Sequence, residues 1–345
     1  MNEPGKARIF ARIALVATLL ASLPLVLGLL ANYHPAFDSL GHFRVHLAVL
    51  VGLGGLVLLT TRHWRHGALS VALGVGALWT TLQAFPSSTP GAQASEGAAD
   101  RATYKLMQLN LLFNNPAPEK VLSLIGRASP DVILLEEASS EWKPFIALLS
   151  ARYPYSIVCD SPRRVGGVAI VSRRPFAVDT TPACLDEGMM ARATLDLGGQ
   201  VLDVAALHLL WPWPFEQPGQ LDRLVPILGT LGETAILAGD LNATTWSSAV
   251  RRVEAAGGLA HLTGIGPTWL TDLLPYALRP YIGLPIDQIM GKGEVAILAV
   301  RTLDPAGSDH LPLMVEFQMT GSSNKDTGET VTAMAAAALD AAGIR

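Results

Sequence analysis

The chain has 345 residues, which is enough for one or two domains; half of them are hydrophobic and only 16% are charged. Its mean hydropathy of +0.35 excludes an ordinary soluble protein throughout its length. Residues 100–320 carry 17 lysines and arginines against 23 aspartates and glutamates, a net charge of −6, which disfavours a protein that depends on neutralising the phosphates of DNA but does not forbid a nuclease.

The excess of apolar residues is concentrated in three stretches before residue 90. These stretches span residues 9–31, 45–60 and 68–85. Because a helix needs about 20 apolar residues to cross a bilayer, we predict a membrane domain with three transmembrane helices over residues 1–86, although the second stretch is slightly short. The basic start also fits a cleaved signal peptide followed by a hairpin.

Positive charges in the short loops predict the orientation of these helices. Lysine and arginine are enriched on the cytoplasmic side of a membrane. Here they lie at the start of the first stretch and between the second and the third: Lys6, Arg8, Arg12, Arg62 and Arg65. We therefore expect a multi-pass inner (plasma) membrane protein with a cytoplasmic N-terminus. Everything beyond the third stretch would face the periplasm or another extracytoplasmic space.

The rest of the chain reads as a linker, a globular domain and a tail. Residues 87–100 are rich in proline, serine, glycine and alanine, as flexible linkers are. We expect a globular domain over residues 101–320 and a flexible tail over 321–345. Both cysteines, Cys159 and Cys184, fall in the globular domain, where an oxidising compartment favours a disulfide over two free thiols.

Short apolar runs, ended by polar clusters, recur along the globular domain. We predict helices at residues 118–129, 139–153, 217–233 and 247–258, and strands at 104–110, 131–137, 166–175, 191–197, 200–209, 234–241, 285–293, 295–304 and 310–319. Strands outnumber helices, and neighbouring strands often have links of hairpin length. This pattern indicates an α/β domain with mixed sheets.

Polar residues follow several of these strands where the apolar run stops. They are Asn110, Glu136, Glu137, His208, Asp240, Asn242, Asp287, Asp309 and His310. Residues two apart in a strand share a face, so Asp240 and Asn242 could together orient a water and a phosphate. Aspartate and asparagine are also common turn formers, and each of these residues alone is weak evidence for a site.

Taken in order, these residues and their motifs resemble the endonuclease/exonuclease/phosphatase superfamily of metal-dependent phosphoesterases. The resemblance covers residues 104–317 and includes the motifs DVILLEE, GGVAIVSRRP, LHL, GDLN, IDQI and SDH. It implies a four-layer α/β (α+β) sandwich, in which two mixed β-sheets are flanked by helices. Here that sandwich would follow the three predicted transmembrane helices.

The resemblance also implies hydrolysis of a phosphate ester by direct attack of water, with Mg²⁺ or Mn²⁺ as cofactor. A hard cation prefers oxygen ligands and neutralises an anionic ester. Glu137, Asn110 and Asp309 would lie at the metal, and Glu136 stands where the family usually has glutamine. Asp240 would orient or deprotonate the attacking water.

The other matching residues would contact the phosphate. Asn242 would fix it, and His310, held by Asp287, would stabilise the developing negative charge. His208 resembles the second histidine of the nuclease and sphingomyelinase branches. Residue Leu112 replaces the acidic residue of the DNA-repair members, which weakens an inference to abasic-site cleavage.

Two loops are candidates for substrate contact. Arg163 and Arg164 lie in one of them, although a solvated loop explains them equally well. Trp211 and Trp213 alternate with prolines in the other, which is either a rigid loop packed on its own domain or a surface for apolar substrate or the membrane interface.

We therefore predict a membrane-anchored, divalent-metal phosphodiesterase on the extracytoplasmic side. Its partners would be the lipid bilayer and a phosphodiester or phosphomonoester substrate, either a lipid head group or a nucleic acid. The alternative is a non-catalytic membrane scaffold or binding module that keeps the fold.

Overall fold

The computed structural model describes residues 3–83, 101–269 and 278–321. The predicted linker over 87–100 and the predicted tail beyond residue 321 lie outside these ranges. The chain forms two compact units. One comprises Met1–Thr89, His208–Thr230 and Asp240–Gln288; the other comprises Pro90–Leu207, Leu231–Gly239 and Ile289–Arg345.

Four helices form the N-terminal part of the first unit. They are α1 (Glu3–Leu29), α2 (Pro35–Gly41), α3 (Arg44–Leu59) and α4 (Trp64–Gln83). Leu25, Ala48, Val51 and Ala77 are buried together and form a small core that joins α1, α3 and α4. Many of the other apolar side chains of these three helices are exposed.

The prediction of three transmembrane helices is wrong. Among the described residues, one helix, at Gly5–Leu29, is long and apolar enough to cross a membrane, or up to two if the bent pair of α2 and α3 is one span. The 16 residues of α3 are too few for a bilayer core of about 30 Å at 1.5 Å per residue. Polar residues such as Arg65, His66, Ser70 and Thr81 dilute the apolar character of α4.

The prediction of two mixed sheets is confirmed, and each sheet has six strands. Their orders are β11-β12-β1-β2-β4-β3 and β5-β6-β7-β8-β10-β9. The pairs β1–β2 and β7–β8 are parallel, whereas β1–β12, β2–β4 and β6–β7 are antiparallel. The strands are β1 (Thr103–Asn110), β2 (Val132–Glu136), β3 (Tyr155–Cys159), β4 (Val168–Ser172), β5 (Ala183–Leu185), β6 (Met190–Asp196), β7 (Val201–Leu207), β8 (Ala235–Asp240), β9 (Ala260–His261), β10 (Asp287–Lys292), β11 (Val295–Thr302) and β12 (Leu313–Met319).

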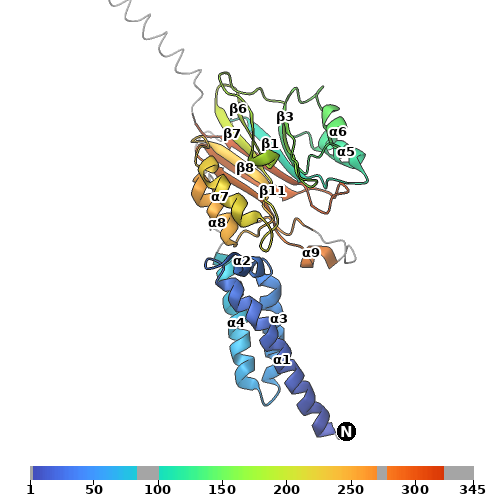
Figure 1. Cartoon of the computed structure of the whole chain (residues 1–345), viewed down its shortest axis with the longest axis vertical. Helices are drawn as coiled ribbons and strands as arrows, with labels where there is room; N and C mark the ends of the chain where they lie inside the picture. The colour runs from blue at the N-terminus through green and yellow to red at the C-terminus, as the bar shows by residue number, and fades with distance from the viewer. Residues whose placement is uncertain (1–2, 84–100, 270–277, 322–345) are drawn as a thin grey trace, which may run out of the picture. The chain divides into compact units, whose positions relative to one another are not determined.

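Helices flank these sheets (Figure 1). They are α5 (Pro118–Ala128), α6 (Lys143–Ala147), α7 (Gln217–Leu228) and α8 (Ser248–Gly257). A short helix, α9 (Arg279–Ile282), and a 3₁₀ turn at Asp186–Gly188 belong to connections between strands. The apolar side of α5 packs against alternate residues of β1, such as Met107 and Leu109. Val121, Leu124 and Ile125 supply that side at helical spacing.

Gly239 occupies a position where the backbone of β8 approaches β7 closely. A Cβ atom at this position would lie 1.9 Å from the carbonyl oxygen of Leu207. We expect Gly239→Ala to destabilise the protein by about 3 kcal/mol, because rigid backbone cannot move aside cheaply. Thermal unfolding of the full chain in detergent measures this loss. Gly126→Ala, at an exposed position in α5 with open space around it, should change stability by less than about 1 kcal/mol.

Cys159 and Cys184 form a disulfide, as predicted. It joins β3 of one sheet to β5 of the other and closes a loop of 25 residues in sequence. By loop-closure entropy, replacing both cysteines with serine should cost about 3 kcal/mol of stability. Thermal unfolding with and without reductant checks this value; an equal melting temperature for oxidised and reduced protein would contradict it.

Candidate active site

The first group of predicted site residues lies where β1 and β2 end. These strands are parallel and pair Asn110 with Glu136, so the side chains that follow emerge at the same edge of the sheet. Glu137 leaves β2 with a left-handed φ of 53°. Asn110 Nδ2 donates to Glu137 Oε1 at 3.1 Å, and the backbone N–H of Phe113 donates to Oε2 at 2.7 Å.

Burial raises the pKa of Glu137 above its ordinary value of 4.5. The hydrogen bonds from Phe113 and Asn110 oppose this shift, as does the charge of His310, whereas the negative charge of Asp309 adds to it. Glu137 is thus a buried carboxyl group whose ionised form is disfavoured. A cation at this position would offset that penalty.

The sequence motifs did not identify Ser308, which links the loop before β12 to the end of β1. Its hydroxyl donates to the carbonyl oxygen of Asn110 at 2.7 Å and accepts from the backbone N–H of His310 at 3.0 Å. The serine of the motif SDH therefore orients the histidine that follows it. A serine two residues before the residue whose N–H it binds is a local turn signal that could have identified it.

Glu136 is fully buried and accepts a hydrogen bond from Gln108 Nε2 at 2.7 Å. Consecutive residues of a strand point to opposite faces. Glu136, the last residue of β2, is thus held by Gln108 of the neighbouring strand β1, whereas Glu137 lies just beyond the end of β2.

The second group lies at the end of β8. Asp240 is the last residue of that strand, and its Oδ1 accepts from the backbone N–H of Asn242 at 2.8 Å. Asn242 has a left-handed φ of 46° and donates from Nδ2 to the carbonyl oxygen of Leu209 at 2.8 Å. The GDLN motif is therefore a polar turn as well as a cluster of functional groups, and Asn242 does not continue the strand.

His208 joins this second group from the end of β7. Its Nε2 lies 3.6 Å from Asp240 Oδ2 and 3.5 Å from Asn242 Nδ2. His208 and Asp240 are both almost completely buried. Their side chains are therefore held in place by packing as well as by polar contacts.

Another acid, Asp287, opens β10, and its backbone N–H donates to Thr268 Oγ1 at 3.2 Å. Asp240 and Asp287 each offer a carboxylate oxygen, and these oxygen atoms lie within 4.8 Å of each other. Two carboxylates at this spacing suit a divalent cation. Both residues are buried.

The four predicted substrate-contact residues lie in loops outside these groups. Arg163 and Arg164 line a cavity of about 410 Å³ together with Phe113, and the Arg164 guanidinium lies 4.8 Å from the centre of the Phe113 ring. Trp211 and Trp213 are half exposed.

Comparison with known proteins identifies the class of protein. The family model described as "Endonuclease/Exonuclease/phosphatase family" matches residues 107–310, which is more than half of the chain. The chain belongs to this family of hydrolases. The search of curated proteins found no match.

Solved structures share the fold at low sequence identity. An endonuclease/exonuclease/phosphatase from Beutenbergia cavernae is 21% identical, with a TM-score of 0.51 over 64% of this chain and 72% of the other. TDP2 from D. rerio, solved with a single-strand DNA product, is 18% identical, with a TM-score of 0.51 over 63% and 100%. The 3′ phosphatase NExo from Neisseria, solved with a product DNA hairpin, is 20% identical, with a TM-score of 0.50 over 62% and 99%.

Proposed function

We propose that this protein is a divalent-metal-dependent phosphodiesterase that hydrolyses its substrate by direct attack of water. The observation that carries the proposal is the buried group after β8, in which Asp240 contacts Asn242 and His208 and has an oxygen within 4.8 Å of an oxygen of Asp287. Membership of a hydrolase family supports the same reaction class.

The proposed cofactor is Mg²⁺ or Mn²⁺. The donor set of Glu137, Asp309 and Asn110 fits such an ion, since carboxylate and amide oxygens suit both metals. Glu137, Asn110 and Asp309 are proposed to hold it on the side of β1 and β2, where the buried Glu137 carboxylate favours a cation. When bound, the ion would neutralise charge on the phosphate.

Asp240 is proposed to orient the attacking water and accept its proton. Its Oδ1 is engaged by the N–H of Asn242, and its Oδ2 lies near His208. These contacts fix the carboxylate in one orientation, as positioning of a general base requires. Asn242 is proposed to donate to a phosphate oxygen.

The two histidines are proposed to stabilise negative charge on the phosphate as it develops. His310 is positioned by Ser308 at its backbone, and we propose that Asp287 sets its ring orientation. His208 would act beside Asp240 and Asn242, which its Nε2 approaches. Donors held in place before the reaction contribute most to such stabilisation.

We further propose that α1 anchors the protein in a membrane and that the hydrolase faces an extracytoplasmic space. Only 17% of the most apolar stretch of α1 is buried in the protein, so its side chains suit lipid. Lys6, Arg8 and Arg12 precede the apolar core of α1, which favours a cytoplasmic N-terminus. The disulfide between Cys159 and Cys184 suits an oxidising compartment.

The proposed substrate is a lipid head group or a nucleic acid. An anchored enzyme with half-exposed Trp211 and Trp213 would meet phospholipids readily, because tryptophan favours the membrane interface. TDP2 and NExo were solved with DNA products, which keeps nucleic acid in the proposal. Arg163 and Arg164 are proposed to contact the anionic substrate in either case.

Hydrolysis of bis-(p-nitrophenyl) phosphate by the full chain in detergent tests this function. Activity should disappear after chelation and return with Mg²⁺ or Mn²⁺. Phospholipid vesicles, single- and double-stranded DNA, and RNA, offered in parallel, would then identify the substrate. Turnover no greater than that of Asp240→Ala would reject the enzyme and favour a non-catalytic scaffold.

A further inference from the structure

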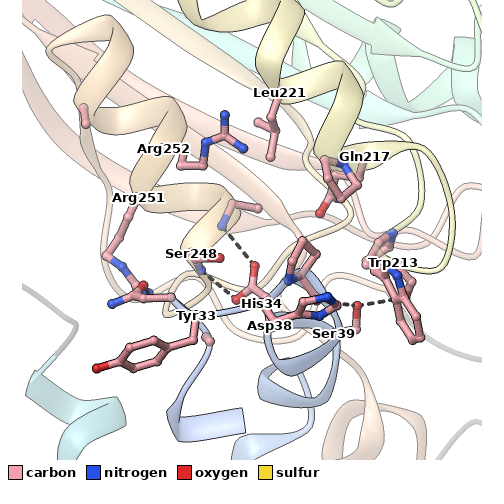
Figure 2. Close-up of a pocket in the computed structure, with 17 residues that line it drawn as sticks. Tyr33, His34, Asp38, Ser39, Trp213, Gln217, Leu221, Ser248, Arg251 and Arg252 are labelled. Carbon is pink, nitrogen blue, oxygen red and sulfur yellow. Dashed lines mark hydrogen bonds between the residues drawn. The ribbon is translucent and has the colours of Figure 1, made fainter. Parts of the chain in front are cut away.

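The short helix α2 completes the N-terminal cap of α8, which lies far from it in sequence. Asp38 Oδ1 accepts from the backbone N–H of Ser248 at 2.7 Å, and Oδ2 accepts from that of Ala249 at 3.1 Å (Figure 2). The helix also has a local cap, because Ser247 Oγ accepts from Val250 N–H. One carboxylate from α2 thus satisfies two N–H groups that a helix start leaves open.

The last residue of α2, Gly41, and the residue after it, His42, hold the loop between β8 and α8, residues 241–247. The backbone N–H of Thr244 donates to His42 Nδ1 at 3.3 Å, and Thr244 Oγ1 lies 3.2 Å from the same nitrogen. Trp246 Nε1 donates to the carbonyl oxygen of Gly41 at 2.8 Å. His42, Thr244 and Trp246 are all buried.

These contacts bear on the site because the same loop carries Asn242 and begins directly after Asp240. The loop has no regular secondary structure of its own. Gln217 and Gln288 bind its first half through Leu241, Ala243 and Thr245. Its path is therefore determined by the turn at Asp240, by these two glutamines and by further partners at its far end. Those partners belong to the N-terminal segment, 202 residues away in sequence for His42 and Thr244.

We propose that α2 and His42 form a positioning element for the 241–247 loop, so that the N-terminal segment contributes to catalysis besides its role as an anchor. This inference rests on the proposed function for its effect on turnover. Asp38 and His42 are positioning residues, since they act on Asp240 and Asn242 through the loop. A domain cut before residue 101 would lack both of them.

The contacts of this segment with α8 differ in burial, and this difference supplies a control. Arg251 Nη2 donates to Asn32 Oδ1 at 2.6 Å on the exposed rim. Exposed polar contacts contribute little to stability, whereas a buried group that loses its partner is costly. Asn32→Ala removes a contact of the same N-terminal segment and leaves in place both atoms of the bond from Arg251 Nη1 to the carbonyl oxygen of Trp246.

The test uses the full chain in detergent and compares His42→Leu, His42→Asn and Asn32→Ala. His42→Leu removes the acceptor, and we expect kcat to fall at least tenfold with KM within twofold of wild type. His42→Asn restores an acceptor oxygen and should recover most of the rate. Asn32→Ala should stay within twofold of wild type in both constants.

Hydrogen–deuterium exchange supplies a readout that does not depend on activity. In His42→Leu, amides of residues 242–247 should exchange faster, while those of β1 and β2 keep the wild-type rate. If His42→Leu does not fold, Trp246→Phe removes only the N–H that reaches Gly41 and should show the same local increase.

Two outcomes would overturn the inference. One is an unchanged rate of amide exchange in the 241–247 loop of these variants. The other, in an active wild type, is an unchanged kcat in both His42→Leu and Trp246→Phe. A wild type without hydrolase activity would reject the proposed function, and the exchange of the loop would still decide whether α2 and His42 hold it.

Discussion

Asp240→Asn is expected to lower kcat for bis-(p-nitrophenyl) phosphate by about 10³-fold, within the range for loss of a general base. The amide cannot accept the proton of the attacking water. It can still accept the N–H of Asn242 through its oxygen, so the turn after β8 should survive. The comparison is made with the full chain in detergent at saturating Mg²⁺ or Mn²⁺.

Asp222→Asn is the matched control for this substitution. Asp222 is exposed on α7 and pairs with Arg252 at 2.7 Å, away from the proposed chemistry. Surface pairs of this kind contribute about 0–1 kcal/mol, so activity and melting temperature should stay near those of wild type. If Asp240→Asn retained full turnover, Asp240 could not be the base.

Glu137→Gln is expected to weaken metal binding by at least about 100-fold, more than loss of a typical outer-sphere partner. The pKa of Glu137 is raised in the folded, metal-free protein. The contribution of Glu137 to the free energy of unfolding is therefore fully present below pH 4.5 and is lost as pH rises through the folded-state pKa. A cation reverses that loss by binding the ionised form. Wild type should therefore gain thermal stability from Mn²⁺, and the gain should grow as pH rises through that pKa.

Titration of the melting temperature with Mn²⁺ at several pH values measures this effect. Glu137→Gln should lose both the shift and its pH dependence. Glu119→Gln, in the first turn of α5, changes the charge equally elsewhere and should keep them. A metal-induced shift of wild-type size in Glu137→Gln would contradict this role for the carboxylate.

Sequence patterns predicted the site's strand ends because polar residues interrupt apolar runs there. The runs that stop at Asn110 and Asp240 became the ends of β1 and β8, and Glu137 directly follows β2. These signals are local, so a single sequence carries them. The disulfide partners were also predictable, since the chain has two cysteines.

Elements with weak local signals were missed or overextended. The strand β3, at the edge of its sheet, exposes much of its first residues and so lacks a continuous apolar run. The helix predicted over 139–153 is α-helical only at Lys143–Ala147. In both cases tertiary contacts decide the outcome more than the local sequence does.

The N-terminal segment shows the limits of composition most clearly. Apolar content predicted three spans, but it does not record the length of α3 or its bend of 66° against α2. The helix α2 itself was not predicted. Asp38 accepts from Ser248 across 210 residues of sequence, so nothing near Asp38 indicates its partner.

The central claim is that Glu137 holds a divalent cation for hydrolysis by a water that Asp240 activates. Anomalous diffraction from crystals of the full chain grown with Mn²⁺ tests it most directly. We expect a peak at about 2.0–2.3 Å from a carboxylate oxygen of Glu137. An ordered Glu137 side chain with no peak beside it, or a peak bound only elsewhere, would contradict it.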